Sequence, residues 1–264
     1  MTEYRTLIVR VTIFWAGYIA ILLLGSFPRN MVPTHWAQAV WAVWGAVLVF
    51  AMTVVFVRYE GRDLHDVGLG FDGATIPKFA LGLLAGAAVY ATTLAVFVVA
   101  GGVRVVRAAG FDAAAMTFAA GTFVASACME GFGFRGYPQH TLQRSFGAWP
   151  AVITAAAFFA LSHVAFGWPW NQVLLGVLPN GVLFGMVTLA SRGLAMPVAL
   201  HAAINMAQWS FGEDGGRGPW KIVVDPAALP RVQASAPITA LVVYALGILA
   251  AWLWYRSRRY ATNR

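Results

Sequence analysis

Four polar side chains capable of acid–base and hydrogen-bond chemistry lie in otherwise apolar stretches of the sequence. They are Glu130, His163, His201 and Asn205. A charged side chain at the centre of a bilayer costs about 2.5–3.5 kcal/mol on insertion scales, so an acid retained there usually marks a functional site. One carboxylate, two imidazoles and one carboxamide in such surroundings favour a reaction centre over a purely structural role.

The spacing of these residues suggests how they would act. His201 and Asn205 lie four residues apart, so a helix places both on one face. Two such donors can stabilise a developing oxyanion, each by about 2.7–4 kcal/mol, although the pair could also simply join two helices, for about 0.6–2 kcal/mol. His163 could be a packing residue, or it could act with Glu130 to hold and deprotonate a water molecule.

The composition predicts the elements that must position these residues. Of the 264 residues, 60% are hydrophobic and 11% are charged, whereas soluble domains are about 25% charged. We therefore expect an all-α polytopic membrane protein that forms one integral membrane domain over residues 1–264. About eight transmembrane helices are expected, near residues 7–25, 37–57, 77–100, 114–134, 148–165, 172–190, 194–211 and 237–255.

The net charge of +8 comes from basic residues in short loops and after the last apolar run. This pattern argues against nucleic-acid binding, which needs a basic face on a folded domain. Eight spans place both termini on one side of the membrane, and most of the loop Lys and Arg residues fall on that side. We therefore predict a multi-pass protein of the plasma (inner) membrane with both termini in the cytoplasm.

Three short motifs together resemble the CPBP family, which includes type II CAAX prenyl endopeptidases and bacteriocin-processing or abortive-infection proteins. The family's Glu-Glu-x-x-x-Arg, Phe-x-x-x-His and His-x-x-x-Asn elements occur here in the family's order, over residues 114–211. The matching residues are Glu130 and Arg135, Phe159 and His163, and His201 and Asn205. Residues 114–211 would then form the catalytic core helices of the domain.

The resemblance implies a prokaryotic intramembrane endopeptidase of the glutamic type that needs no cofactor. Glu130 and His163 would activate water, His201 and Asn205 would stabilise the tetrahedral oxyanion, and Arg135 would have a structural or electrostatic role. The partners implied are membrane lipid and a protein or peptide substrate, which is lipidated in part of the family.

The sequence departs from the family's pattern at Gly131, where the second glutamate of the first motif is missing. On an α-helix this position lies four residues before Arg135, the favourable spacing for an ion pair. Our hypothesis is that Arg135 pairs with another group, Glu130 included, which would make Glu130 a poorer base. An inactive family member that acts as a transporter, an immunity protein or a scaffold is therefore an alternative.

Two further mechanisms stay open at this level. Glu130, His163 and His201 could bind zinc, with water as the fourth ligand. The single cysteine, Cys128, could act as a nucleophile. It lies two residues before Glu130 and so faces another side of a helix, and a free buried cysteine is commonly just a small apolar residue.

Overall fold

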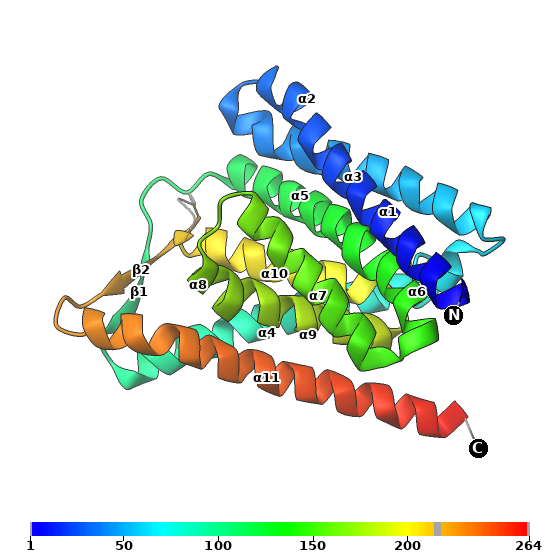
Figure 1. Cartoon of the computed structure of the whole chain (residues 1–264). Helices are drawn as coiled ribbons and strands as arrows, with labels where there is room; N and C mark the ends of the chain where they lie inside the picture. The colour runs from blue at the N-terminus through cyan, green and yellow to red at the C-terminus, as the bar shows by residue number, and fades with distance from the viewer. Residues whose placement is uncertain (1, 214–217, 263–264) are drawn as a thin grey trace.

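In the computed structural model the chain forms a bundle of helices that run roughly along one direction (Figure 1). The structure describes residues 2–213 and 218–262. In this part of the chain, seven helical segments are long and apolar enough to cross a membrane: Tyr4–Asn30, Thr34–Tyr59, Thr75–Ala100, Ala113–Phe146, Ala148–Ala165, Trp170–Ser191 and Leu229–Arg259. The expected helical, polytopic membrane architecture is confirmed.

The segments are built from individual helices with the following bounds. The first half of the bundle contains α1 (Thr2–Leu24), α2 (Ser26–Asn30), α3 (Thr34–Tyr59), the 3-10 turn η1 (Leu64–Val67), α4 (Thr75–Ala100), α5 (Ala113–Glu130), the π-helix η2 (Gly131–Gly136) and α6 (Tyr137–Phe146). The second half contains α7 (Ala148–Ala165), α8 (Trp170–Gln172), the π-helix η3 (Val173–Val177), α9 (Leu178–Ser191), α10 (Ala195–Ser210) and α11 (Leu229–Thr262).

The seventh of the eight expected spans, residues 194–211, corresponds to helix α10, which has 16 residues. This is shorter than the roughly 20 residues that a full crossing needs. α10 packs against α4, α5 and α9, so protein rather than lipid surrounds much of it.

Gly86 of α4 lies against the backbone of α10 at Leu200, where a Cβ atom would clash with the carbonyl oxygen. The close approach of these two helices therefore requires glycine.

Two expected helix boundaries were wrong. The span expected at 114–134 continues through η2 and α6 to Phe146, because α6 is amphipathic and its polar face hides it from a search for apolar runs. The last helix, expected at 237–255, begins already at Leu229. Pro230 follows directly, and proline suits the first turn of a helix because its fixed φ angle is already helical.

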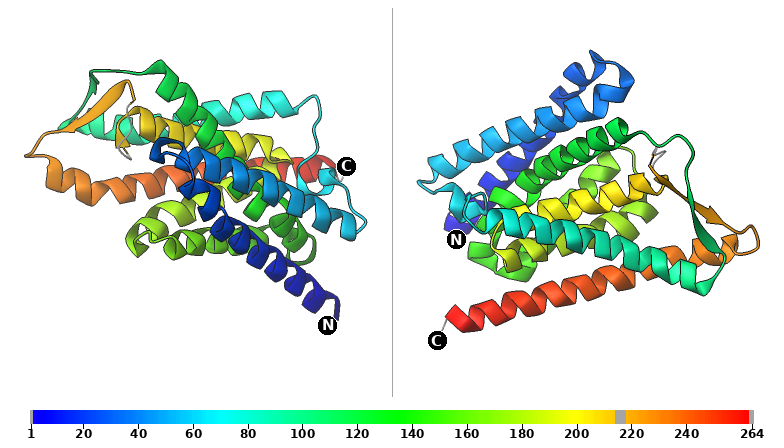
Figure 2. Two further views of the ribbon diagram at one scale, coloured as in Figure 1. Left: turned by 90° about the horizontal axis from the view of Figure 1, so that it is seen from above. Right: turned by 180° about the vertical axis from the view of Figure 1, so that it is seen from behind.

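Two short strands form the one described exception to the all-α expectation. β1 (Val103–Arg107) and β2 (Trp220–Val224) pair antiparallel, with Val103 opposite Val224. They join the connection after α4 to the connection after α10, at the end of the bundle opposite the two termini (Figures 1 and 2). Segments more than a hundred residues apart in sequence meet here, and no local pattern indicates such a pairing.

Candidate intramembrane active site

Glu130 is the last residue of α5, and the chain continues from it into the π-helix η2. A π-helix closes its hydrogen bonds between residues five apart, and π-helical turns are frequent at functional sites. The wider π-helical turn places Arg135 nearer to the face that carries Glu130 than an α-helix would. In an α-helix Arg135 would instead share a face with position 131, as the sequence spacing predicted.

Helix α1 holds this π-helix from the side. The indole N–H of Trp15 donates a hydrogen bond to the carbonyl oxygen of Gly133, with an N···O distance of 3.2 Å. The Tyr18 ring lies so close to Gly133 that a Cβ atom there would clash with it. Gly133 therefore allows the contact between α1 and the helix that carries Glu130.

The Glu130 carboxylate lies beside the His201 imidazole of α10. Glu130 Oε2 is 3.6 Å from His201 Nδ1, and the two side chains are 16% and 10% exposed. Within the described part of the chain, neither of these two buried atoms has a hydrogen-bond partner. The structure thus pairs the acid most closely with His201, whereas the resemblance implied a pairing with His163.

The orientation of the His163 ring follows from one backbone contact. Its Nδ1 atom lies 2.9 Å from the carbonyl oxygen of Phe159, one helical turn earlier. A carbonyl oxygen only accepts hydrogen bonds, so Nδ1 carries the proton and donates it. In the neutral ring Nε2 is then an acceptor, and the ring as a whole packs edge-to-face with the ring of Trp168.

Arg135 is buried and lies between two aromatic rings. Its guanidinium carbon is 4.7 Å from the ring centre of Phe159 and 4.8 Å from that of Phe184. None of the described carboxylates lies within 4.0 Å of it, so the ion pair with Glu130 that we considered is not formed. Cation–π contacts of this kind are worth about 2 kcal/mol when desolvated.

Phe184 of α9 is a site residue that the sequence did not reveal. The His201 ring stacks on it with ring centres 4.6 Å apart and planes 24° apart, while Arg135 lies over the same ring. Phe184 thus fixes the imidazole and the guanidinium at once. In the sequence it is one phenylalanine of 18, inside an apolar run, and nothing sets it apart.

The four predicted site residues line one cavity of about 710 Å³. Glu130 comes from α5, His163 from α7, and His201 and Asn205 from one face of α10. Arg135 supports the site through the aromatic rings but does not line the cavity. The structure therefore brings the four residues together, while their chemical roles remain predictions.

Carboxamides form a second group of lining residues that the sequence analysis missed. They are Gln38, Asn171, Gln172, Asn180, Gln208 and Gln233. Four of them are exposed and lie near the starts of α3, α8 and α11: Gln38, Asn171, Gln172 and Gln233. These helix starts lie at the end of the bundle opposite the termini, so the cavity opens there (Figure 1). Scattered polar residues near helix ends give no signal in a sequence, because only the fold brings them to one cavity.

Neither alternative mechanism gains support from the geometry. Among residues 2–213 and 218–262, no three His, Cys, Asp or Glu side chains form a group that could hold a metal ion, and the zinc alternative stays a prediction to be tested. Cys128 packs against the apolar cluster of Ala127, Leu194 and Val198 rather than lining the cavity.

The fold and the site define a polytopic helical membrane protein whose polar centre of one acid, two histidines and one asparagine surrounds an internal cavity. A family model described as type II CAAX prenyl endopeptidase Rce1-like matches residues 112–207. This segment contains all four candidate site residues, so the resemblance to the CPBP family is confirmed over it. The match suggests a CAAX-type intramembrane protease. No curated protein matches the chain.

Proposed function

We propose that this protein is an intramembrane endopeptidase that hydrolyses a peptide bond in a membrane-associated or lipidated protein. The observation that carries this proposal is the convergence of Glu130, His163, His201 and Asn205 from three helices on one cavity. The family match over residues 112–207 supports the reaction class.

Glu130 acts as the general base in this mechanism. A water molecule in the cavity gives a proton to the Glu130 carboxylate as its oxygen attacks the carbonyl carbon of the scissile bond. His163 orients that water, because its Nδ1–H is held by the Phe159 carbonyl oxygen and its Nε2 atom is left to accept a hydrogen bond. General base catalysis of this kind contributes about 10²–10⁴-fold to the rate.

His201 and Asn205 stabilise the tetrahedral oxyanion. Once Glu130 holds the proton, its carboxyl group can donate a hydrogen bond to Nδ1 of His201. The two atoms are 3.6 Å apart in the structure, so this distance must shorten for the hydrogen bond to form. The imidazole then presents Nε2–H to the oxyanion together with the amide of Asn205. When the carbon–nitrogen bond breaks, Glu130 returns its proton to the leaving amine.

The lining of the cavity indicates what part of a substrate it holds. Each carboxamide side chain offers both a donor and an acceptor, as a peptide group does. Gln38, Asn171, Gln172 and Gln233 at the mouth can therefore bind the backbone of an extended segment. With both termini in the cytoplasm, as the basic residues predict, this segment would enter from the opposite side of the membrane.

The decisive experiment compares cells that produce the wild-type protein with cells that produce Glu130→Gln, by mass spectrometry of protein termini. We expect new C-termini that depend on the wild type, and their loss by at least about 100-fold in the variant. Cys128→Ser is the matched control, because it changes the same helix two residues away and outside the cavity. This control should cleave normally.

The same assay separates the competing readings. If wild-type and Glu130→Gln cells contain the same protein C-termini, and both proteins are folded in the membrane, the proposed protease activity is contradicted and a non-catalytic role is favoured. Cleavage by the purified protein that stops in chelator and returns with zinc would establish the metal mechanism instead. Loss of cleavage in Cys128→Ser would point to the thiol.

A further inference from the structure

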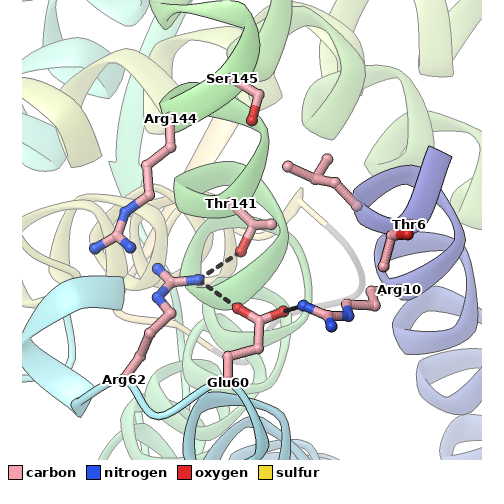
Figure 3. A pocket seen from close by; sticks show the side chains of 8 residues that line it. Thr6, Arg10, Glu60, Arg62, Thr141, Arg144 and Ser145 are labelled. Atoms are coloured by element: carbon pink, nitrogen blue, oxygen red, sulfur yellow. Dashed lines mark hydrogen bonds and ion pairs between the residues drawn. The ribbon is translucent and has the colours of Figure 1, made fainter. Parts of the chain in front are cut away.

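A separate polar pocket of about 390 Å³ lies at the end of the bundle that holds both termini. It is formed by α1, α6 and the loop after α3, and none of the candidate active-site residues lines it (Figure 3). Its lining is dominated by charges and hydroxyls: Arg10, Glu60, Arg62, Thr141, Arg144 and Ser145.

The one carboxylate that lines this pocket is fully engaged. Glu60 accepts hydrogen bonds from Arg10 at 3.2 Å, from Arg62 at 3.0 Å and from the Tyr137 hydroxyl at 2.5 Å. Burial raises the pKa of Glu60, but these hydrogen bonds and the two arginine charges outweigh it and lower the pKa. Glu60 is therefore ionised at neutral pH and joins α1, α3 and α6.

The arginines retain an excess of positive charge and of donors. Three guanidinium groups share the pocket with Glu60, and Arg144 is further balanced by Asp66 at 2.8 Å. Arg62 is 10% exposed and donates to Thr141 at 2.9 Å, yet its buried Nε atom has no hydrogen-bond partner among the described residues. Figure 3 shows Arg62 between Arg144 and Glu60.

We propose that this pocket binds a phosphate group, carried either by the headgroup of an anionic membrane lipid or by a soluble compound. The planar guanidinium fork matches phosphate oxygens in a bidentate way, and the hydroxyls of Thr141 and Ser145 add donors beside it. Basic pockets between transmembrane helices on the cytoplasmic side are known to hold lipid headgroups.

The depth of the pocket favours the lipid source. It lies where α1 begins and where α3 and α6 end, so its residues stand at the ends of three candidate membrane spans, where a bilayer would present its headgroups. Tyr4 and Phe146, both exposed, form an aromatic pair with ring centres 5.6 Å apart next to the pocket residue Ser145. Exposed aromatic side chains gather at the membrane interface.

The test uses the full chain in lipid nanodiscs of phosphatidylcholine, with increasing phosphatidylglycerol. We expect phosphatidylglycerol to raise the melting temperature, and Arg10→Gln or Arg144→Gln to weaken its apparent affinity about tenfold. These two arginines are 39% and 52% exposed, so their replacement should leave the fold intact. Arg58→Gln is the matched control, because Arg58 is exposed at the same end but outside the pocket.

The possible results distinguish a lipid phosphate from a soluble one, and both from the absence of a phosphate site. A stabilisation by phosphatidylglycerol that Arg144→Gln weakens and Arg58→Gln does not would support a lipid phosphate. An arginine-dependent stabilisation by inorganic phosphate alone would support a soluble source. Two results would overturn the proposal. In the first, phosphatidylglycerol raises the melting temperature equally in the wild type, Arg10→Gln and Arg144→Gln. In the second, Arg58→Gln weakens the apparent affinity for phosphatidylglycerol as much as the two pocket variants do.

Discussion

Arg135 illustrates how the chain tolerates the loss of a motif residue. An arginine inside a membrane protein is costly unless its charge is compensated, and the family's second glutamate is absent at Gly131. Here the faces of Phe159 and Phe184 flank the guanidinium instead. A Cβ atom at Gly131 would lie 3.0 Å from a methyl group of Val198, so the first side-chain carbon of a glutamate at this position would already contact α10.

This arrangement predicts the effect of a conservative change at Arg135. Arg135→Lys keeps the charge but loses the planar group that stacks between two rings, so we expect a loss of about 2 kcal/mol in unfolding free energy. Thermal unfolding in detergent measures it, with the exposed Arg58→Lys as the control. An unchanged melting temperature combined with lost cleavage would show that Arg135 acts on the reaction and not on the fold.

At the scale of elements, the contact between α1 and the π-helix η2 positions Glu130. Trp15 satisfies a carbonyl group of η2, and Tyr18 packs directly on Gly133. A π-helix has an irregular hydrogen-bond ladder, so a partner from a neighbouring helix helps to stabilise it in an apolar environment. Helices outside the family-matched segment therefore contribute to the site.

A pair of glycine substitutions tests this contact. Gly133→Ala places a methyl group on the Tyr18 ring and should destabilise the protein by about 1–3 kcal/mol while lowering cleavage. Gly121→Ala, in α5, meets nothing within 4 Å and should be neutral or stabilising by up to about 1 kcal/mol. Equal melting temperatures for the two variants would argue against a tight contact between α1 and η2.

At the scale of the whole molecule, the two pockets open at opposite ends of the bundle. The termini and the helix ends that form the arginine pocket lie at one end of the bundle, whereas the starts of α3, α8 and α11, which carry the mouth residues of the candidate active site, lie at the other end with the β1–β2 pair (Figure 2). If the basic residues set the orientation, the candidate active site opens on the side of the membrane away from the cytoplasm.

Cysteine labelling tests this orientation. In a Cys128→Ser background, Ala109→Cys lies at the end with the strands and Gly73→Cys at the end with the termini, and both positions are exposed. We expect a membrane-impermeant thiol reagent added to intact cells to label Ala109→Cys and to spare Gly73→Cys. The reverse pattern would place both termini outside the cytoplasm.

The sequence alone determined the helical membrane fold and the four candidate site residues. Apolar runs of about 20 residues leave few other folds, because a bilayer requires every backbone polar group to be satisfied within the protein. Against that background Glu130 and His163 stand out, and local spacing already places His201 and Asn205 on one face. Local signals sufficed for these features.

The tertiary structure decided the rest. The aromatic support from Phe184, the carboxamide-lined mouth and the arginine pocket around Glu60 all join segments far apart in the chain, as does the contact of α1 with the π-helix that carries Arg135. Each depends on which helix faces meet, and helix packing in a membrane follows close steric fit more than any hydropathy pattern. For this physical reason the sequence indicated the candidate site residues, and the fold alone defined their partners.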